Sequence, residues 1–425
     1  MSDQTRRRLG TPSLGAIVAA NMIGAGVFTT SGFALGDLGS PGWVMVAWLL
    51  GGVLAIAGSL CYGALAARLS ESGGEYLFLS RTLHPSIGFL AGWVSIWAGF
   101  TGAIALAAEA AQVYLGPWLP AGLAPDWIGS GVIVLAGLLH TRGVGPATWV
   151  QNSVVTIKVV LLLVLVGVGA AQLAPQPEPV ASSFSFATFA ATMMWISLSY
   201  SGWNGAVYVA GEARDPKRTL PRSMLFATLV VTALYLALNW VFLHSAPVDQ
   251  LAGRKDVAAI AARNLGGAGL ENLVRVVLVI ALLTSVSSMV MIGPRVMARM
   301  ADDGLLPRKL AFTGKVPTAA IWTQVILAVG VLWASGLRQQ LTNLGWILSL
   351  FTALTVIGLM RLRRTEGPAR LPIPGYPWIP AFFLLATLGL TCTMVFVRGS
   401  QLLPALSVLF SGAVLYAIQR RTTRS

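Results

Sequence analysis

Long apolar stretches recur along this chain of 425 residues, and they leave few structures open to it. A helix needs about 20 apolar residues to cross a bilayer. Hydrocarbon offers no partner to an unpaired backbone N–H or C=O group, so a spanning segment must satisfy its own backbone. Charged residues make up 10% of the chain, against about 25% in soluble domains. The sequence therefore predicts an all-α membrane protein that crosses the bilayer many times.

Twelve of these stretches are predicted to be transmembrane helices. They cover residues 13–37, 42–67, 86–115, 126–140, 147–171, 186–211, 219–244, 268–300, 317–335, 340–361, 377–397 and 401–419. The fourth is short, with 15 residues. Between the second and third spans, Glu71 to Leu83 are polar enough to form an interfacial loop with a short helix.

The basic residues favour one orientation of these helices. If both ends of the chain are cytoplasmic, 22 of the 29 Lys and Arg residues lie on the cytoplasmic side, 6 lie outside and Lys158 lies within a span. Cytoplasmic loops carry such an excess of positive charge. We therefore expect both termini in the cytoplasm and a location in the cell inner (plasma) membrane. The net charge of +14 does not indicate binding to nucleic acid, because the basic residues are spread between apolar spans.

Two of the spans are interrupted by glycine at corresponding places. The first span is interrupted at Ile23, Gly24, Ala25 and Gly26, and the sixth at Ser199, Tyr200, Ser201, Gly202, Trp203, Asn204 and Gly205. These residues except Gly205, together with Leu198, are the candidate substrate-binding residues. Non-helical backbone survives in hydrocarbon only where it lines a cavity, and paired interruptions mark the substrate site of many transporters. Glycines that only allow close helix packing are the alternative, which the polar residues of the second break make weaker.

The spacing of the two breaks predicts an internal repeat. Gly24 and Gly202 are 178 residues apart, so we expect the sixth span to begin a second repeat as the first span begins the first. We expect two inverted five-helix repeats, 13–171 and 186–361, followed by two further helices in 377–419. The tails, 1–12 and 420–425, are expected in the cytoplasm.

The two breaks would offer opposite partial charges to one small molecule. Freed N–H groups at Ala25, Gly26 and Val27 begin a half-helix, whose positive end attracts a carboxylate. Carbonyl groups freed between Leu198 and Ser201 end another half-helix, and its negative end favours an ammonium group. The sequence therefore predicts a transporter of a small zwitterion.

Longer motifs give the chain a resemblance to a known family. The stretches are Asn21 to Phe28, Glu71 to Tyr76, Tyr200 to Asn204, Gly211 to Arg222, Pro294 with Arg295, Met300 to Pro307, and Tyr376 to Pro380. They are similar to those of the amino acid–polyamine–organocation permeases, and among these to the L-type amino acid transporter branch. The resemblance implies sodium-independent carriage of amino acids by alternating access. It implies that Ile23 to Gly26 bind the substrate carboxylate, and that carbonyls from Leu198 to Ser201 bind the amino group.

Two positions of the sixth span depart from patterns in similar proteins. Members of the family often place an aromatic gate where this chain has Leu198, so strong aromatic occlusion is not expected unless Tyr200 or Trp203 substitutes. Acid-resistance cation exchangers that resemble this family carry a glutamate where this chain has Asn204, which implies a neutral substrate here. Eukaryotic relatives pair with a glycoprotein through a cysteine between spans three and four. The loop from Gly116 to Asp126 has none, so we expect no disulfide-linked heavy chain.

Charged residues within the spans are the candidates for coupling. Lys158 lies near the middle of span five, where a charge costs about 2.5–3.5 kcal/mol, so that a functional role is the default. Lys158 could exchange a proton, or it could equally act as a tethered cation, for which span eight offers Thr284, Ser285, Ser287 and Ser288 as oxygen partners. Similar bacterial members carry a lysine in this segment, which implies that Lys158 takes the place of a sodium ion. Snorkelling of Lys158 to the interface is the alternative. Glu109 is either a proton relay or polar lining, or a carboxylate that reaches extracellular water.

The sequence and this resemblance together predict sodium-independent transport of neutral L-amino acids, coupled to protons or working by exchange. An exchanger or exporter of polyamines is the alternative within transport, and it calls for acidic pocket residues, of which Glu109 is the candidate. A non-transporting amino acid sensor of the same fold is another. We expect no enzyme, because mid-membrane His, Asp and paired carboxylates are lacking. No cofactor and no metal are expected, since the sequence has neither a His/Cys/Glu cluster nor a phosphate-binding loop.

Overall fold

The computed structural model describes residues 9–120, 122, 124–142, 148–172, 184–312 and 316–422. Its elements are helices, and one isolated β-bridge joins Leu9 to Ala213. Three predicted segments fall partly outside the described residues. These are residues 1–8 of the first tail, Ala147 at the start of the fifth span, and residues 423–425 of the second tail.

The α-helices are α1 (Thr11–Met22), α2 (Gly26–Leu38), α3 (Pro41–Arg68), α4 (Gly74–Thr82), α5 (Pro85–Val94), α6 (Ala103–Leu115), α7 (Pro125–Thr141), α8 (Thr148–Gln172), α9 (Phe186–Ser199), α10 (Pro216–His244), α11 (Val248–Leu251), α12 (Val257–Asp302), α13 (Thr318–Ala334), α14 (Leu337–Glu366), α15 (Trp378–Arg398) and α16 (Leu403–Thr422). A π-helix, η2 (Ser95–Gly102), joins α5 to α6. The 3-10 helices are η3 (Gly116–Trp118), η4 (Gly205–Glu212), η5 (Arg308–Leu310), η6 (Pro368–Arg370) and η7 (Gly399–Leu402).

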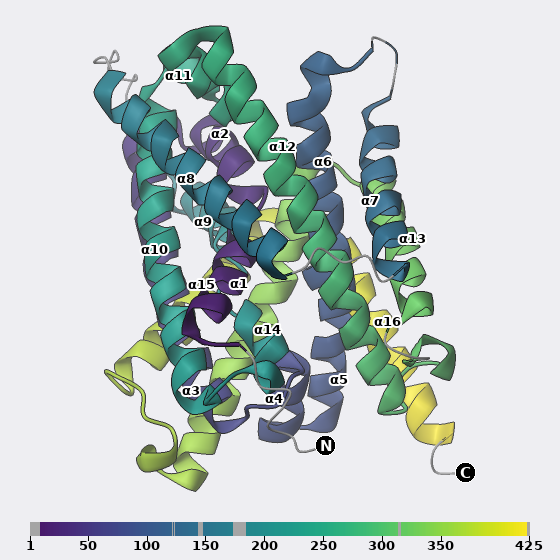
Figure 1. Cartoon of the computed structure of the whole chain (residues 1–425). Coiled ribbons are helices and arrows are strands. Elements are labelled where there is room, and N and C mark those ends of the chain that lie inside the picture. Colours follow the sequence, from purple (N-terminus) through teal and green to yellow (C-terminus); the bar gives the residue numbers. More distant parts are fainter. Residues whose placement is uncertain are drawn as a thin grey trace.

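Several stretches have the length and composition of membrane spans. Within the described residues, seven are long and apolar enough to cross a membrane, namely Thr11–Leu38, Pro41–Arg68, Pro85–Trp118, Pro216–His244, Val257–Asp302, Leu337–Glu366 and Trp378–Gln419. Three shorter apolar helices accompany them, Thr156–Gln172, Phe186–Ser199 and Thr318–Ala334. The long helices run between two ends of the molecule, with α11 at the upper end and α4 at the lower end of Figure 1. Large apolar side chains such as Phe226 and Phe396 project outward, as contact with lipid requires.

Local sequence signals set where these helices begin and end. Proline stands in the first turn of α3, α5, α7 and α10, where its missing N–H has no helical partner to lose. Gly39 ends α2 in a left-handed conformation with φ of 63°, and its N–H donates to the carbonyl of Leu35. The spans are therefore delimited by ordinary helix boundaries at their ends.

The first and sixth predicted spans are not continuous α-helices. α1 ends at Met22 and α2 begins at Gly26, and the Gly24 N–H donates to the Met22 carbonyl at 2.8 Å. α9 ends at Ser199, and the chain then turns into η4. The rest of the predicted sixth span, 186–211, is a 3-10 helix with a kink at Val209 rather than an α-helix. Glycine and β-branched residues in this stretch lower its preference for α-helix, which accounts for the difference.

The two breaks lie against each other, and glycine makes this approach possible. A Cβ on Gly26 would lie 2.5 Å from Ser199 Oγ and 2.7 Å from Ser199 Cα. Gly202 has φ of +103°, and a Cβ there would lie 2.6 Å from the backbone carbon of Asn21. Each interruption therefore packs its glycine onto the backbone of the other.

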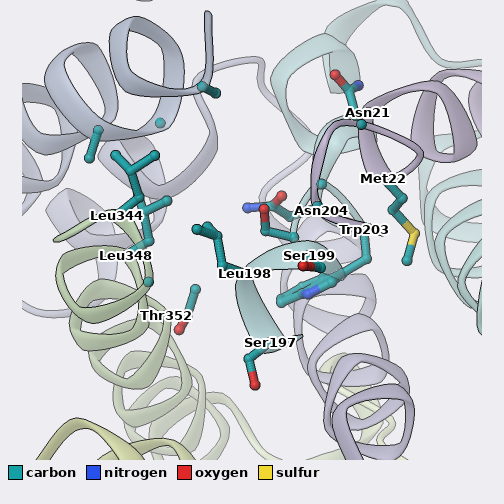
Figure 2. A pocket seen from close by; sticks show the side chains of 18 of the residues that line it. Asn21, Met22, Ser197, Leu198, Ser199, Trp203, Asn204, Leu344, Leu348 and Thr352 are labelled. Carbon is teal, nitrogen blue, oxygen red and sulfur yellow. The ribbon is translucent and has the colours of Figure 1, made fainter. Parts of the chain in front are cut away.

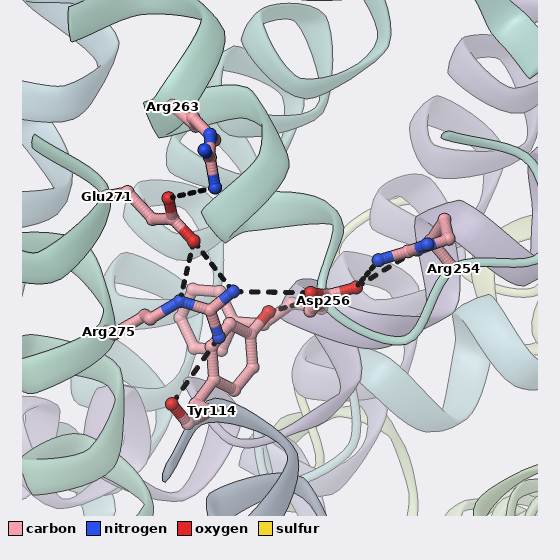
Figure 3. Close-up of polar contacts among 7 residues, drawn as sticks. Tyr114, Arg254, Asp256, Arg263, Glu271 and Arg275 are labelled. Atoms are coloured by element: carbon pink, nitrogen blue, oxygen red, sulfur yellow. Dashed lines mark hydrogen bonds and ion pairs between the residues drawn. The ribbon is translucent and has the colours of Figure 1, made fainter. Parts of the chain in front are cut away.

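The upper end of the molecule is held by a buried cluster of charges (Figure 3). Arg275 of α12, only 5% exposed, forms ion pairs with Glu271 at 2.8 Å and with Asp256 at 3.4 Å. Its guanidinium also donates to the carbonyl oxygen of Tyr114 on α6. Because a buried charge is costly unless paired and hydrogen-bonded, these contacts fix α12 against α6 at this end.

Candidate functional site

A cavity of about 190 Å³ lies where the two breaks meet. This is many times the space that one water molecule needs. Its walls come from the breaks themselves and from η2, α3, α12, α14 and α15. Figure 2 shows Leu198 projecting across it toward Leu344 and Leu348 of α14, with Asn204 and Trp203 beside the break. The walls are largely apolar, with hydroxyl, amide and backbone groups at a few places.

Most of the predicted substrate-binding residues line this cavity, and two do not. Those at its wall are Gly24, Ala25, Gly26, Leu198, Ser199, Ser201, Gly202, Trp203 and Asn204. Ile23 is buried away from it, and its carbonyl oxygen accepts a hydrogen bond from Lys158. Tyr200 also lies outside the wall, because its ring packs on Trp48 and its hydroxyl donates to the Trp48 carbonyl at 3.0 Å. Tyr200 therefore supplies support for the site and no aromatic lid.

Hydrogen bonds join the two breaks and fix their termini. The Tyr235 hydroxyl donates to the Met22 carbonyl at 2.6 Å and lies 3.3 Å from the Ser199 carbonyl. Thr30 of α2 and Ser199 of α9 share a hydrogen bond of 2.9 Å. The start of α2, whose first N–H groups have no helical partner, thus lies beside the end of α9. A site of this kind can attract an anionic and a cationic group at neighbouring points.

Lys158 is the buried cation of the site. Its side chain comes from α8 and is 3% exposed, and Nζ donates to the Ile23 carbonyl oxygen at 2.6 Å. Ile23 ends the first half of the broken span, where backbone carbonyls lack helical partners. The ammonium group therefore lies at the first break rather than at the surface, and the geometry excludes snorkelling.

One predicted partner of Lys158 on α12, Ser287, makes a hydrogen bond to another side chain. The Ser287 hydroxyl shares a hydrogen bond of 2.9 Å with Nε2 of His140 on α7. Ser288 is the next residue of α12, and Ser285 lines the cavity and lies near Gly24. His140 is 6% exposed, and this hydrogen bond joins α7 to α12. Its distance along the chain from Ser287 is what concealed this pair.

Glu109 lies away from Lys158 and reaches neither the cavity wall nor open solvent. Its carboxylate pairs with Lys255 at 3.3 Å and accepts hydrogen bonds from the Leu337 N–H at 3.0 Å and from Gln340. The residue is 7% exposed, so the expected carboxylate in extracellular water is not found. Because Leu337 starts α14, Glu109 accepts from an N–H that the helix cannot satisfy. Through these hydrogen bonds, Glu109 links α6 to α14.

A cation at the start of α14 contacts aromatic side chains of both broken spans. Arg338, in the first turn of α14, places its guanidinium 4.8 Å from the ring centre of Trp195 and 5.9 Å from that of Phe33. It also forms an ion pair with Asp37 of α2. Because α2, α9 and α14 all contribute, these contacts link both broken spans to α14. This contact of Arg338 was not predicted from the sequence, because only the fold brings the residue near the aromatic rings.

Two further features of the cavity wall were not predicted from the sequence. The π-helix η2 contributes Ser95, Gly99 and Phe100, and π-helical turns are frequent at functional sites. The carboxyl of Glu75, at the α4 end of the cavity, accepts from the Tyr62 hydroxyl at 2.6 Å and lies 3.4 Å from the Asn204 amide nitrogen. Glu75 stands in one of the family motifs, and its neighbouring glycines were the signal that could have marked it.

Comparison with known proteins identifies the class that this fold and cavity define. A family model described as "Amino acid permease" matches residues 9–417. The chain therefore belongs to the amino acid permease family. It is a multi-pass membrane protein that transports amino acids, and it is not an enzyme.

Three relatives show how wide the similarity is. The chain is 27% identical to the serine/threonine exchanger SteT of Bacillus subtilis over 89% of this chain and 90% of that protein. It is 24% identical to the branched-chain amino acid permease BcaP of Lactococcus lactis, with 88% and 86% covered. It is also 24% identical to the human large neutral amino acids transporter small subunit 2, with 89% and 74% covered.

Proposed function

We propose that this protein is a sodium-independent secondary transporter of neutral L-amino acids that works by alternating access. The observation that carries the proposal is the cavity between the two breaks, which has a helix start beside a helix end and walls that are largely apolar. An amino acid carries one carboxylate and one ammonium group, and these two helix ends offer a partner to each. The relatives named above as exchangers or permeases of neutral amino acids support the same substrate class.

We further propose twelve spans, with 13–171 and 186–361 as inverted repeats and helices 1 and 6 unwound at mid-membrane. The element order supports this division, because each break is followed by one long helix. These helices are α3 with 28 residues and α10 with 29, and they pack along each other. Both termini are assigned to the cytoplasm and the protein to the plasma membrane. We propose no disulfide-linked partner, and the two cysteines of the chain, Cys61 and Cys392, are free.

The role of Lys158 in this proposal is to replace a coupling sodium ion. A cation at the Ile23 carbonyl neutralises the partial negative charge where the first half-helix ends. A covalently tethered ammonium group supplies this charge without a dissolved ion. Transport then needs no sodium, and its coupling is to protons or to the exchange of a second amino acid.

Uptake into proteoliposomes tests the proposal. We expect the purified full-length protein, in vesicles loaded with unlabelled L-serine, L-alanine or L-leucine, to accumulate the same labelled amino acid by counterflow in sodium-free buffer. Replacing potassium by sodium in the buffer should leave the rate unchanged. Binding of an amino acid without counterflow would instead make the protein a sensor. Counterflow of polyamines with none of neutral amino acids would favour the alternative substrate class.

The size of the side-chain pocket should depend on Leu198. A Leu198→Phe variant introduces a larger ring opposite Leu344 and Leu348, so we expect leucine uptake to fall at least about tenfold relative to serine uptake (Figure 2). Competition of the two amino acids in one counterflow assay measures the ratio. The matched control is Leu385→Phe, because Leu385 of α15 is 71% exposed on the outer face. An unchanged ratio in the Leu198 variant would remove this residue from the pocket.

A further inference from the structure

Glu75 is a carboxyl that the proposed function has not used. It is 3% exposed at the start of α4, and it lines the same cavity as Gly24, Gly26 and Ser199. α4 itself lies outside the candidate membrane spans. A buried carboxylate is normally paired with a cation. Among the described residues, no Lys or Arg side chain forms an ion pair with Glu75.

The groups around this carboxyl are polar but uncharged. Tyr62 of α3 donates to it at 2.6 Å, and the Asn204 amide lies 3.4 Å away. Tyr208 of η4 packs against Gly74, so its phenol faces the same place. Two phenols and one amide thus face the carboxyl from α3 and from the second break.

The charged groups on the neighbouring elements have other partners. Those of the described residues around α4 are Arg68 of α3, which pairs with Glu366; Arg361 of α14, which donates to the Leu83 carbonyl; His84 before α5, which bonds Ser86; and Arg299 of α12, which pairs with Asp303. In the part of the chain that the structure describes, no cation therefore pairs with the Glu75 carboxylate. Burial raises the pKa of Glu75 to about 7, while the hydrogen bonds from Tyr62 and Asn204 lower it.

We propose that Glu75 is the group that binds the coupling proton. When the cavity opens outward, the carboxylate takes one proton from outside water and an O–H bond forms. When the cavity opens at the α4 end, this bond breaks and the proton passes to water on that side. One proton thus enters and one leaves in each cycle, with no change in oxidation state.

The position of the carboxyl links the proton to the substrate. Glu75 lines the cavity that contains the proposed amino acid site, so both reach it by the same route. Its amide neighbour Asn204 belongs to the second break, so a change in the carboxyl's charge acts on backbone that also contacts the substrate. This inference rests on the proposed transport function, and it selects proton symport over exchange alone.

The first test compares Glu75→Gln with the unchanged protein in proteoliposomes. The unchanged protein should accumulate labelled L-alanine when the inside is made alkaline, up to about tenfold for each pH unit, because one proton is carried with each substrate. Glu75→Gln keeps an acceptor for Tyr62 but binds no proton. We expect it to lose gradient-driven accumulation to a greater extent than counterflow at equal pH. Accumulation equal to that of the unchanged protein would overturn the proposal.

A matched control and a second variant complete the test. Glu71→Gln changes an exposed carboxylate before α4, and it should respond to the gradient as the unchanged protein does. Tyr62→Phe keeps the carboxyl and removes the donor that stabilises its charged form, so the Glu75 pKa rises and the midpoint of gradient-driven uptake moves to higher pH. A merely structural role of Tyr62 would change the rate without moving this midpoint. If Glu75→Gln loses counterflow as well, an unmoved midpoint in Tyr62→Phe overturns the inference.

The outcomes separate this inference from the proposed function. If the unchanged protein shows no counterflow of any neutral amino acid, the transport function itself fails. If counterflow is present but the unchanged protein ignores the pH gradient, the function stands as exchange and the assignment of Glu75 fails.

Discussion

Replacing Lys158 by alanine should reduce counterflow of neutral amino acids at least about tenfold while the protein still folds. The Nζ of Lys158 donates to the Ile23 carbonyl at 2.6 Å in a buried place, and a hydrogen bond from a charged group contributes about 1.5–3 kcal/mol. Its loss leaves the end of α1 without its cation, so the first break no longer holds its geometry. Counterflow measured at equal pH, with size-exclusion chromatography to establish folding, gives the result.

A neighbouring control separates the ammonium group from helix packing. Ile157 precedes Lys158 in α8 and is 57% exposed on the outer face, so Ile157→Ala should transport at the unchanged rate. Lys158→Met retains the length of the side chain without its charge, and it should fail as the alanine variant does. Full activity of Lys158→Met would show that packing, and not the cation, is what this position requires.

A second large effect is expected at the glycines of the two breaks. Gly202→Ala would place a Cβ 2.6 Å from the backbone of Asn21 at a residue with φ of +103°. Such backbone strain costs about 1–3 kcal/mol, and the clash would push the two breaks apart. Gly26→Ala meets Ser199 in the same way. We expect both variants to lose counterflow and to unfold at a lower temperature in a thermal-shift assay.

The matched control for these variants is Gly131→Ala in α7. A Cβ on Gly131 meets no other atom within 4 Å, and alanine is the better helix former. This variant should keep both its transport and its melting temperature, or melt slightly higher. Equal loss of transport in Gly131→Ala and Gly202→Ala would contradict the close packing of the two breaks as the reason.

The amino acid sequence predicted the class of the fold because the bilayer imposes a simple rule. Apolar segments of sufficient length must form helices, and the sparse charged residues mark the ends of those segments. The same rule predicts from the sequence alone that the two glycine breaks line a cavity. The breaks stand among motifs of the amino acid permease family, which the family model then matched over residues 9–417. These features depend on local composition, so the sequence alone is enough to predict them.

Other features depend on residues that are far apart in the chain. The sequence left Glu109 open as a proton relay, polar lining or a carboxylate in extracellular water, and only the fold shows that it accepts a hydrogen bond from Leu337, 228 residues away. Tyr200 was expected at the substrate, but its ring packs on Trp48 and lies outside the cavity wall. His140 and Ser287 form a hydrogen bond across 147 residues, and Arg338 lies over Trp195. No pattern of neighbouring residues indicates such pairs.

The sequence by itself therefore indicated an all-helical, multi-pass membrane protein, the places where two helices are interrupted and the family to which the chain belongs. Only the tertiary structure decided which polar groups meet inside, including Lys158 at Ile23 and Glu75 between Tyr62 and Asn204. Apolar length and glycine content are properties of a single segment and of the lipid or water around it. A hydrogen bond or an ion pair instead requires two atoms within a few ångströms of each other. The folding of distant segments onto one another is what brings such atoms together.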